Sequence, residues 1–310
     1  MEKKAKIVVV GSFNADITAL TPKFPVGGET IMGKSLTFGA GGKGTNQAVS
    51  AAKNGAEVTM VSKVGTDVMA NIAWETYKNS GINSSFVLET VEHPTGSAII
   101  EVSEQSGENK IIVIPGANNY LSASDVQNAD SEISNCDILL TQLETSQESV
   151  GEALKLASEK GKIVVLNPAP YAEIPDSWFS MVDYFIPNET ETEYFTGVKI
   201  TDEASAYDAA KILLGKGVKN VIITLGKKGA LFCNSEEQFI VPTTGSIAVD
   251  TTGAGDCFCG AFCTALAEGK SVKDSVLFAN CASGISVTRY GASASMPTRE
   301  ETDSVFNSIK

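Results

Sequence analysis

The segment "AVDTTGAGDCFCGAF", residues 248–262, sets small residues between two aspartates and then continues as an apolar helix. Apolar side chains after Asp256 recur at helical spacing, and Gly269 is a plausible end of that helix. Gly253 and Gly255 allow a tight turn, so the first N–H groups and the positive end of the helix dipole would face outward. The pattern predicts an anion site for a phosphoryl group beside a carboxylate. The alternative is an ordinary strand-to-helix loop, in which an aspartate is favoured without any function.

A second glycine-rich segment, "FGAGGKGTNQA", covers residues 38–48 and also precedes a helical pattern. Gly41 and Gly42 would let the backbone contact a ligand directly. Lys43 and Asn46 could donate hydrogen bonds to hydroxyl groups. Neither glycine segment has the P-loop spacing, and this one could also be a flexible turn with a surface lysine. Two such segments in one chain favour a ligand site.

Composition excludes several classes of function. The net charge of −13 argues against nucleic acid or an anionic membrane as a partner. The only histidine, His93, lies in a polar stretch, so acid–base chemistry must depend on carboxylates. Cys257, Cys259 and Cys263 do not have zinc-site spacing, which favours reduced thiols in a core. With only a short apolar run near the N-terminus, we expect a cytoplasmic protein.

Six apolar runs have the character of strands that are buried on both faces. They cover residues 6–11, 57–65, 137–143, 162–168, 183–188 and 220–226. Helical patterns alternate with them at residues 43–54, 67–80, 146–160 and 203–216. A further short strand is expected at residues 246–250, just before the glycine loop at residues 253–256. The alternation predicts a three-layer α/β/α fold with a mostly parallel central sheet.

Two segments interrupt this rhythm. Residues 13–40 are rich in Gly, Pro and Thr, and residues 95–114 have the pattern of a hairpin. We predict that they form a small β-sheet lid. The main domain would then consist of residues 1–12, 41–94 and 115–310.

Polar residues gather just after the predicted strands, where ligands bind in open α/β sheets. They are Asn14, Asp16, Glu144, Asn167, Asn188, Glu191, Thr224, Gly226 and Asp256. The sequence therefore predicts a binding site along this edge of the sheet.

"GGKGTNQA" and "DTTGAGDCF" resemble the two signatures of the ribokinase-like (PfkB) family of carbohydrate kinases. The likeness extends over nearly the whole chain and includes "NPAP", "NETE" and "TLGKKG". It implies ATP-dependent phosphorylation of ribose at the 5-hydroxyl, with Mg²⁺ and K⁺ as cofactors. Deoxyribose, fructose or a nucleoside remain open as substrates, as does a non-catalytic sugar-binding regulator. A Rossmann dehydrogenase is excluded because no G-x-G-x-x-G follows the first strand.

The resemblance also implies roles for single residues. Asp256 corresponds to the catalytic base, and Gly253, Ala254 and Gly255 correspond to the anion hole. The residues matching the sugar site are Asn14, Asp16, Gly42, Lys43, Asn46 and Glu144. Those along the nucleotide path are Asn188, Thr224, Gly226, Gly229, Gly255 and Asn280. Those matching the monovalent-cation site are the side chains of Asp250 and Ser295 and the carbonyls of Thr252, Ser286, Arg289 and Gly291.

Glu191 matches the residue that organises magnesium-bound water in this family. From the residues alone, however, Asn188 followed by Glu191 is typical of a helix capping box. Both roles remain open for this pair.

Two positions depart from the family pattern: Cys259 replaces a common Asn, and Thr45 replaces a common Ala. Because lid strands leave edges and apolar faces exposed, we also expect a homodimer formed through the lid.

Overall fold

The computed structural model describes residues 4–310. Its main sheet has nine strands in the order β13-β12-β11-β10-β9-β8-β1-β4-β5. In that order the strands are β13 (Gln238–Val241), β12 (Ala230–Cys233), β11 (Asn220–Thr224), β10 (Tyr184–Phe185), β9 (Ile163–Leu166), β8 (Ile138–Thr141), β1 (Lys6–Val10), β4 (Glu57–Gly65) and β5 (Asn83–Thr90). All neighbours are parallel except the two pairs that β12 makes with β11 and β13. The predicted mostly parallel sheet is confirmed.

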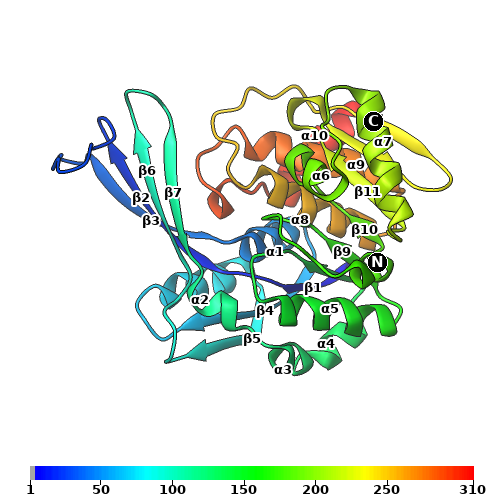
Figure 1. Cartoon of the computed structure of the whole chain (residues 1–310), viewed down its shortest axis with the longest axis horizontal. Coiled ribbons are helices and arrows are strands. Elements are labelled where there is room, and N and C mark those ends of the chain that lie inside the picture. Colours follow the sequence, from blue (N-terminus) through cyan, green and yellow to red (C-terminus); the bar gives the residue numbers. More distant parts are fainter. Residues whose placement is uncertain (1–3) are drawn as a thin grey trace.

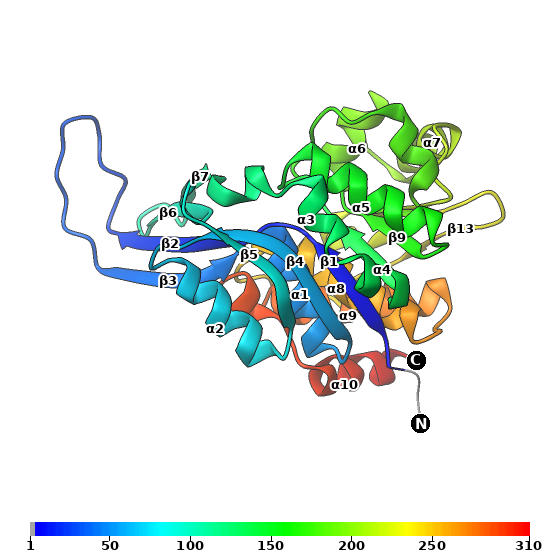
Figure 2. The same ribbon diagram turned by 90° about the horizontal axis from the view of Figure 1, so that it is seen from below.

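Helices cover both faces of this sheet (Figure 2). One face carries α1 (Lys43–Lys53), α2 (Ala70–Ser80), α8 (Ala254–Ala267), α9 (Val272–Ser286) and α10 (Arg299–Ile309). The other carries α3 (Ala123–Gln127), α4 (Asp130–Asn135), α5 (Gln147–Glu159), α6 (Glu189–Thr196) and α7 (Glu203–Gly215). Short 3₁₀ helices are η1 (Gly116–Tyr120), η2 (Asp176–Met181), η3 (Gly226–Lys228) and η4 (Ser293–Ser295). Within residues 4–310, no helix has the length and apolarity that crossing a membrane requires.

Two hydrophobic cores lie between the sheet and its helices. Alternate residues of β1 point to opposite faces, so Val9 joins one core while Val8 and Val10 join the other. The central strands are therefore buried on both sides, which explains their continuous apolar sequences. The three-layer arrangement confirms the fold class predicted from the sequence.

A separate four-stranded sheet projects from the main body (Figure 1). Its order is β3 (Ser35–Gly41), β2 (Asn14–Thr21), β6 (Ser97–Ser103) and β7 (Asn109–Ile114). The two segments expected to form a lid pair with each other, because β2 runs parallel to β6. The exact domain boundaries drawn from the sequence stay a prediction.

The prediction of a strand at residues 246–250 is wrong, because this segment is an irregular loop. The N–H groups of Val249 and Asp250 both donate to the Val287 carbonyl, and no neighbouring strand accepts them. Ile247 is 87% exposed, so its apolar side chain does not mark a core position. The segment contacts the end of α9 through its backbone, while the apolar side chains of Ile247 and Val249 are exposed.

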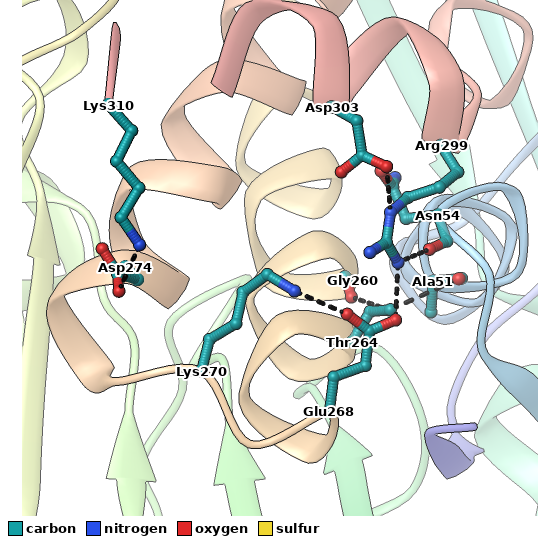
Figure 3. Close-up of polar contacts among 10 residues, drawn as sticks. All are labelled: Ala51, Asn54, Gly260, Thr264, Glu268, Lys270, Asp274, Arg299, Asp303 and Lys310. Carbon is teal, nitrogen blue, oxygen red and sulfur yellow. Dashed lines mark hydrogen bonds and ion pairs between the residues drawn. The ribbon is translucent and has the colours of Figure 1, made fainter. Parts of the chain in front are cut away.

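Helices α1 and α8 are in direct backbone contact. Gly260 makes this possible, because a Cβ atom there would overlap the Gln47 carbonyl oxygen and the Ser50 side chain. Thr264 donates to the Ala51 carbonyl on α1 at 3.3 Å (Figure 3). At the same end of the pair, Arg299 of α10 bonds the Asn54 carbonyl. The two helices that carry the glycine motifs are thus fixed against each other.

The three clustered cysteines, Cys257, Cys259 and Cys263, lie on α8 and are buried with free thiols. Burial raises the pKa of Cys257 to about 12. These cysteines behave as small apolar residues, which agrees with the prediction that they pack in a core.

Candidate active site

Asp256 lies in the first turn of α8 and is 6% exposed. The N-cap residue Gly253 has φ of 74°, a left-handed conformation that glycine adopts without strain. A Cβ atom on Gly253 would also press against Ala292. The turn needs glycine at this position, and it directs the start of α8 toward the cleft described below.

The anion hole expected at this turn has two backbone N–H groups that are free to bind a ligand. The N–H of Ala254 donates to the Thr251 carbonyl at 3.2 Å. Among the described residues, no protein group accepts the N–H of Gly255 or Asp256. Gly255 also faces open space, since an added Cβ would meet no atom within 4 Å. The positive end of the helix therefore presents two N–H groups beside the Asp256 carboxylate.

Lys43 lies close to three carboxylates, one of which is Asp256. Burial disfavours the charged form of Lys43, but the carboxylates of Asp256, Glu144 and Glu191 outweigh this effect and raise its pKa. Burial raises the pKa of Glu191, against the lowering effect of hydrogen bonds from Asn188 and of Lys43. Lys43 therefore stays positively charged among three acidic groups, where it could bind a phosphate.

These groups line a cleft made of two connected cavities. The first, about 210 Å³, is bordered by Lys43, Glu191 and Asp256. The second, about 430 Å³, extends toward Gly226 and Asn280. Residues that border both cavities are Asn188, Thr224, Thr251, Ala254 and Gly255. The open end of α8 thus lies where the two cavities meet.

The larger cavity collects the predicted nucleotide residues. Asn188, Thr224, Gly226, Gly229, Gly255 and Asn280 all line it. Asn280 is 3% exposed, and its amide donates to the carbonyls of Val241 and Pro242. Gly229 has no room for a side chain, because a Cβ atom would overlap the Val241 carbonyl. This cavity has more apolar surface than the first one, as expected for a base-binding pocket.

Asn188 and Glu191 form the capping box that the sequence indicated. The Asn188 side chain accepts from the Glu191 N–H at 2.8 Å, and the Glu191 carboxylate accepts from the Asn188 N–H at 2.9 Å. The Asn188 amide also donates to the second carboxylate oxygen at 2.9 Å. The cap holds Glu191 at the wall of the first cavity. Its magnesium role stays a prediction.

The residues predicted to bind the sugar lie around the base of the lid. Asn14 and Asp16 belong to β2 and point to the same face of the lid sheet. A Cβ atom on Gly41 would overlap the Asp16 carboxylate, so that carboxylate lies directly against the glycine backbone. Burial, and secondarily the charge of Glu144, raises the pKa of Asp16 to about 7. The two carboxylates are therefore close enough to interact.

Glu144 has a structural role as well. Its Oε2 atom accepts from the Ser12 hydroxyl at 2.5 Å and from the Lys43 N–H at 2.8 Å. Lys43 is the first residue of α1, so its N–H has no partner within the helix, and Glu144 accepts this N–H. A carboxylate at this end of a helix is also favoured by the helix dipole.

The six residues expected to hold a monovalent cation come from two segments that meet. They are Asp250, Thr252, Ser286, Arg289, Gly291 and Ser295. The Asp250 carboxylate joins the segments, because it accepts from the N–H groups of Thr252 and Gly291, each at 2.9 Å. Among residues 4–310, no cluster of three or more His, Cys, Asp and Glu side chains could hold a metal ion. The cation site stays a prediction.

Several cleft residues were not predicted as site residues. They are Ala169, Ile186, Thr251 and Cys259 in the first cavity. Phe258, Ser283 and Val287 in the second cavity were also missed. Asn167, one of the polar residues predicted to follow a strand at this edge, lines the first cavity. Apolar lining residues such as Ile186 and Val287 carry no signal that separates them from the core.

Comparison with known proteins decides the family. Residues 4–299 match the family model of the pfkB family carbohydrate kinases. The chain belongs to this family. A ribokinase from Haemophilus influenzae is 41% identical to this carbohydrate kinase over 296 residues, or 96% of each chain. A deoxyribokinase from Salmonella typhi is 38% identical over 300 residues, or 95% of this chain and 96% of the relative.

The solved structures agree with this assignment. A ribokinase from Arabidopsis thaliana, solved in complex with ribose and ATP, superposes on the carbohydrate kinase with a TM-score of 0.91. The two sequences are 32% identical, and the match covers 98% of this chain and 99% of the other. The resemblance expected from the two glycine signatures is confirmed.

Proposed function

We propose that this carbohydrate kinase transfers the γ-phosphoryl group of ATP to the 5-hydroxyl of ribose. The observation that carries the proposal is the juxtaposition of the Asp256 carboxylate with the open N–H groups of Gly255 and Asp256 in one cleft. The relatives named ribokinase support ribose as the acceptor. ATP as the phosphoryl donor is supported by the ATP complex of the Arabidopsis relative.

Asp256 would act as the base that removes the proton from the attacking sugar hydroxyl. The N–H groups at the start of α8 would stabilise negative charge on the oxygens of the phosphoryl group during transfer. Phosphoryl transfer needs positioning and charge stabilisation more than covalent help from the protein. A weak base suffices, because the proton can leave late in a loose transition state.

Glu191 would act on the phosphate side, and Lys43, which the sequence assigns to the sugar site, borders the same cavity and could contact both substrates. Lys43 is held positive by three carboxylates and could bind phosphate oxygens of the nucleotide. Glu191 borders the same cavity and would hold Mg²⁺ through water molecules. When bound, Mg²⁺ would neutralise charge on the phosphate oxygens. The carboxylates that line the cavity fit this ion, because it prefers oxygen ligands.

A monovalent cation site behind the anion hole is part of the proposal. Asp250, Ser295 and the carbonyls of Thr252, Ser286, Arg289 and Gly291 all supply oxygen, which suits K⁺. The Asp250 carboxylate already draws the two contributing segments together. K⁺ in place of Na⁺ should raise the activity, and activity that is indifferent to the cation would exclude this site.

The sugar would bind between the lid and the main sheet. The Asp16 carboxylate would accept hydrogen bonds from sugar hydroxyls, and the Asn14 amide would donate to a neighbouring hydroxyl. The backbone of Gly41 and Gly42 lies alongside. The deoxyribokinase relative makes 2-deoxyribose the second candidate. A panel of ribose, 2-deoxyribose, fructose and a nucleoside, assayed for ADP release, separates the candidates. We expect the highest kcat/KM with ribose, and a higher value with any other acceptor would overturn the assignment.

We propose a homodimer formed through the lid. Large apolar side chains on its edge strands are exposed: Leu36 by 58%, Phe38 by 55% and Ile112 by 62%. Contiguous apolar surface of this kind is typical of an interface. Light scattering should give twice the chain mass, and a monomer mass at every concentration would contradict the proposal.

We also propose a cytoplasmic location, where ATP is present and the six free thiols stay reduced.

A further inference from the structure

Both carboxylate oxygens of Asp256 accept hydrogen bonds from neighbouring residues of α1. The Asn46 amide donates to Oδ2 at 2.9 Å, and the Gln47 amide donates to Oδ1 at 3.0 Å. Asn46 is 5% exposed and Gln47 is fully buried. The close approach of α1 and α8 at Gly260, one turn further along α8, brings these amides within reach.

The Gln47 amide is itself held on both sides. Its oxygen accepts from Gln142 at 2.7 Å, and its nitrogen also donates to the Asn167 oxygen at 3.0 Å. Asn167 in turn donates to the Ile186 carbonyl at 2.8 Å. Carboxylates and carbonyls only accept, so the direction of every bond in this chain of amides is determined. Gln47 cannot rotate without breaking several buried bonds.

Asn46 is fixed from the other direction by Ser293. The Ser293 hydroxyl donates to the Asn46 oxygen at 2.6 Å, and this contact is buried. Ser293 lies in η4, in the segment whose Gly291 N–H donates to the Asp250 carboxylate. The Asp256 carboxylate is therefore held between the core of the sheet on one side and the segment 291–295 on the other.

We propose that Gln47 and Ser293 are positioning residues that hold the Asp256 carboxylate in one orientation before the sugar binds. The inference rests on the proposed function, in which Asp256 is the base. Gln47 and Ser293 border neither cavity of the cleft, so they act on the reaction through the residues that they bond, which are Asp256 and Asn167 for Gln47 and Asn46 for Ser293.

Neutral amides suit this role. An arginine or lysine bonded directly to the carboxylate would also orient it, but such an ion pair would weaken the base. The hydrogen bonds from the Asn46 and Gln47 amides occupy about two of the roughly four lone-pair positions of the Asp256 carboxylate. The other positions remain free for the sugar hydroxyl. A second explanation is purely structural, because any buried carboxylate needs hydrogen bonds. The two explanations differ in what they predict for kcat.

The test compares two serines that each donate one buried hydrogen bond. Ser293→Ala removes the bond to Asn46, whereas Ser50→Ala removes a bond from α1 to the Cys257 carbonyl, away from the carboxylate. We expect Ser293→Ala to lower kcat about tenfold or more, since a misoriented base loses its near-attack geometry. The KM for ATP should not change. Ser50→Ala should lower Tm and leave kcat as it is.

Two further variants sharpen the test. Gln47→Met removes the second amide at similar volume and should lower kcat in the same way, with an unchanged KM for ATP. Ser293→Thr keeps the hydroxyl and should recover most of the kcat lost in Ser293→Ala. If Gln47→Met does not fold, the comparison of Ser293 with Ser50 decides alone.

Equal kcat for Ser293→Ala and Ser50→Ala would overturn the inference. An Asp256→Asn variant separates that result from a failure of the proposed function. If Asp256→Asn is inactive while Ser293→Ala has full activity, only the positioning role is wrong. If Asp256→Asn keeps its turnover, the assignment of the base fails as well.

Discussion

The two ends of the helix pair α1 and α8 carry different kinds of polar network. At the N-terminal ends, neutral amides of Asn46 and Gln47 hold the Asp256 carboxylate. At the C-terminal ends, the Glu268 carboxylate is bonded by the charged side chains of Arg299 at 2.5 Å and Lys270 at 2.8 Å (Figure 3). Both networks connect the same two helices, but only the second neutralises its carboxylate by direct ion pairs.

The difference follows from what each carboxylate has to do. Arg299 also bonds the Asn54 carbonyl at the end of α1 and Asp303 on its own helix, so it ties α10 to both helices. Cations are favoured at the C-terminal end of a helix and anions at its N-terminal end. The Arg299 network therefore favours stability, whereas the amides orient Asp256 and leave its charge available. Four predictions test this contrast, beginning with the largest effect.

Replacing the carboxylate itself should have the largest effect on turnover. Asp256→Asn keeps the size of the side chain but removes the base, so we expect kcat to fall by about 10²–10⁴-fold. Sugar and ATP should still bind, because their other contacts are intact. Steady-state kinetics and calorimetric titration measure the two quantities, and a variant with near-normal kcat would exclude Asp256 as the base.

Gly260→Ala should affect both ends of the helix pair at once. The added methyl group would overlap the Gln47 carbonyl and the Ser50 side chain, which pushes α1 away from α8. We expect a loss of about 1–3 kcal/mol in the free energy of unfolding, together with a lower kcat. Gly215→Ala is the matched control, because a Cβ atom there meets nothing within 4 Å. Equal stability of the two variants would show that the helices are not in close contact.

Arg299→Ala should lower stability but leave catalysis alone. The side chain is 29% exposed and makes bonds to Glu268, Asp303 and the Asn54 carbonyl. We expect a loss of about 1–3 kcal/mol in denaturant unfolding and an unchanged kcat. The control Lys310→Ala breaks a more exposed pair with Asp274 and should change stability by less than about 1 kcal/mol. A large fall in kcat for Arg299→Ala would contradict the separation of the two networks.

The smallest effect concerns pH. Burial alone would raise the pKa of Glu268, but Arg299 and Lys270 outweigh it and lower the pKa below the ordinary value of 4.5. A lowered pKa stabilises the folded protein above pH 4.5, and that stabilisation is lost as the pH falls through the folded-state value. The stability difference between wild type and Arg299→Ala should therefore shrink below pH 4.5. Unfolding curves at several pH values measure it, and a constant difference would point to packing instead.

Much of the fold could be predicted from local sequence patterns. The continuous apolar runs in β1 and β4 require burial on both faces, and the helical spacing in α1 and α8 is equally direct. Asp256 was found because glycines, an aspartate and an apolar helix follow one another within a few residues. These features act through the backbone of a short segment, so the sequence alone determines them.

The environment of Asp256 was decided only by the tertiary structure. Gln47 and Asp256 are 209 residues apart in the chain, and Ser293 and Asn46 are 247 apart. A glutamine on a helix or a serine in a loop has no local pattern that distinguishes a buried partner from solvent. These side chains meet because Gly260 lets two helices approach closely, and such an approach depends on how the whole sheet packs.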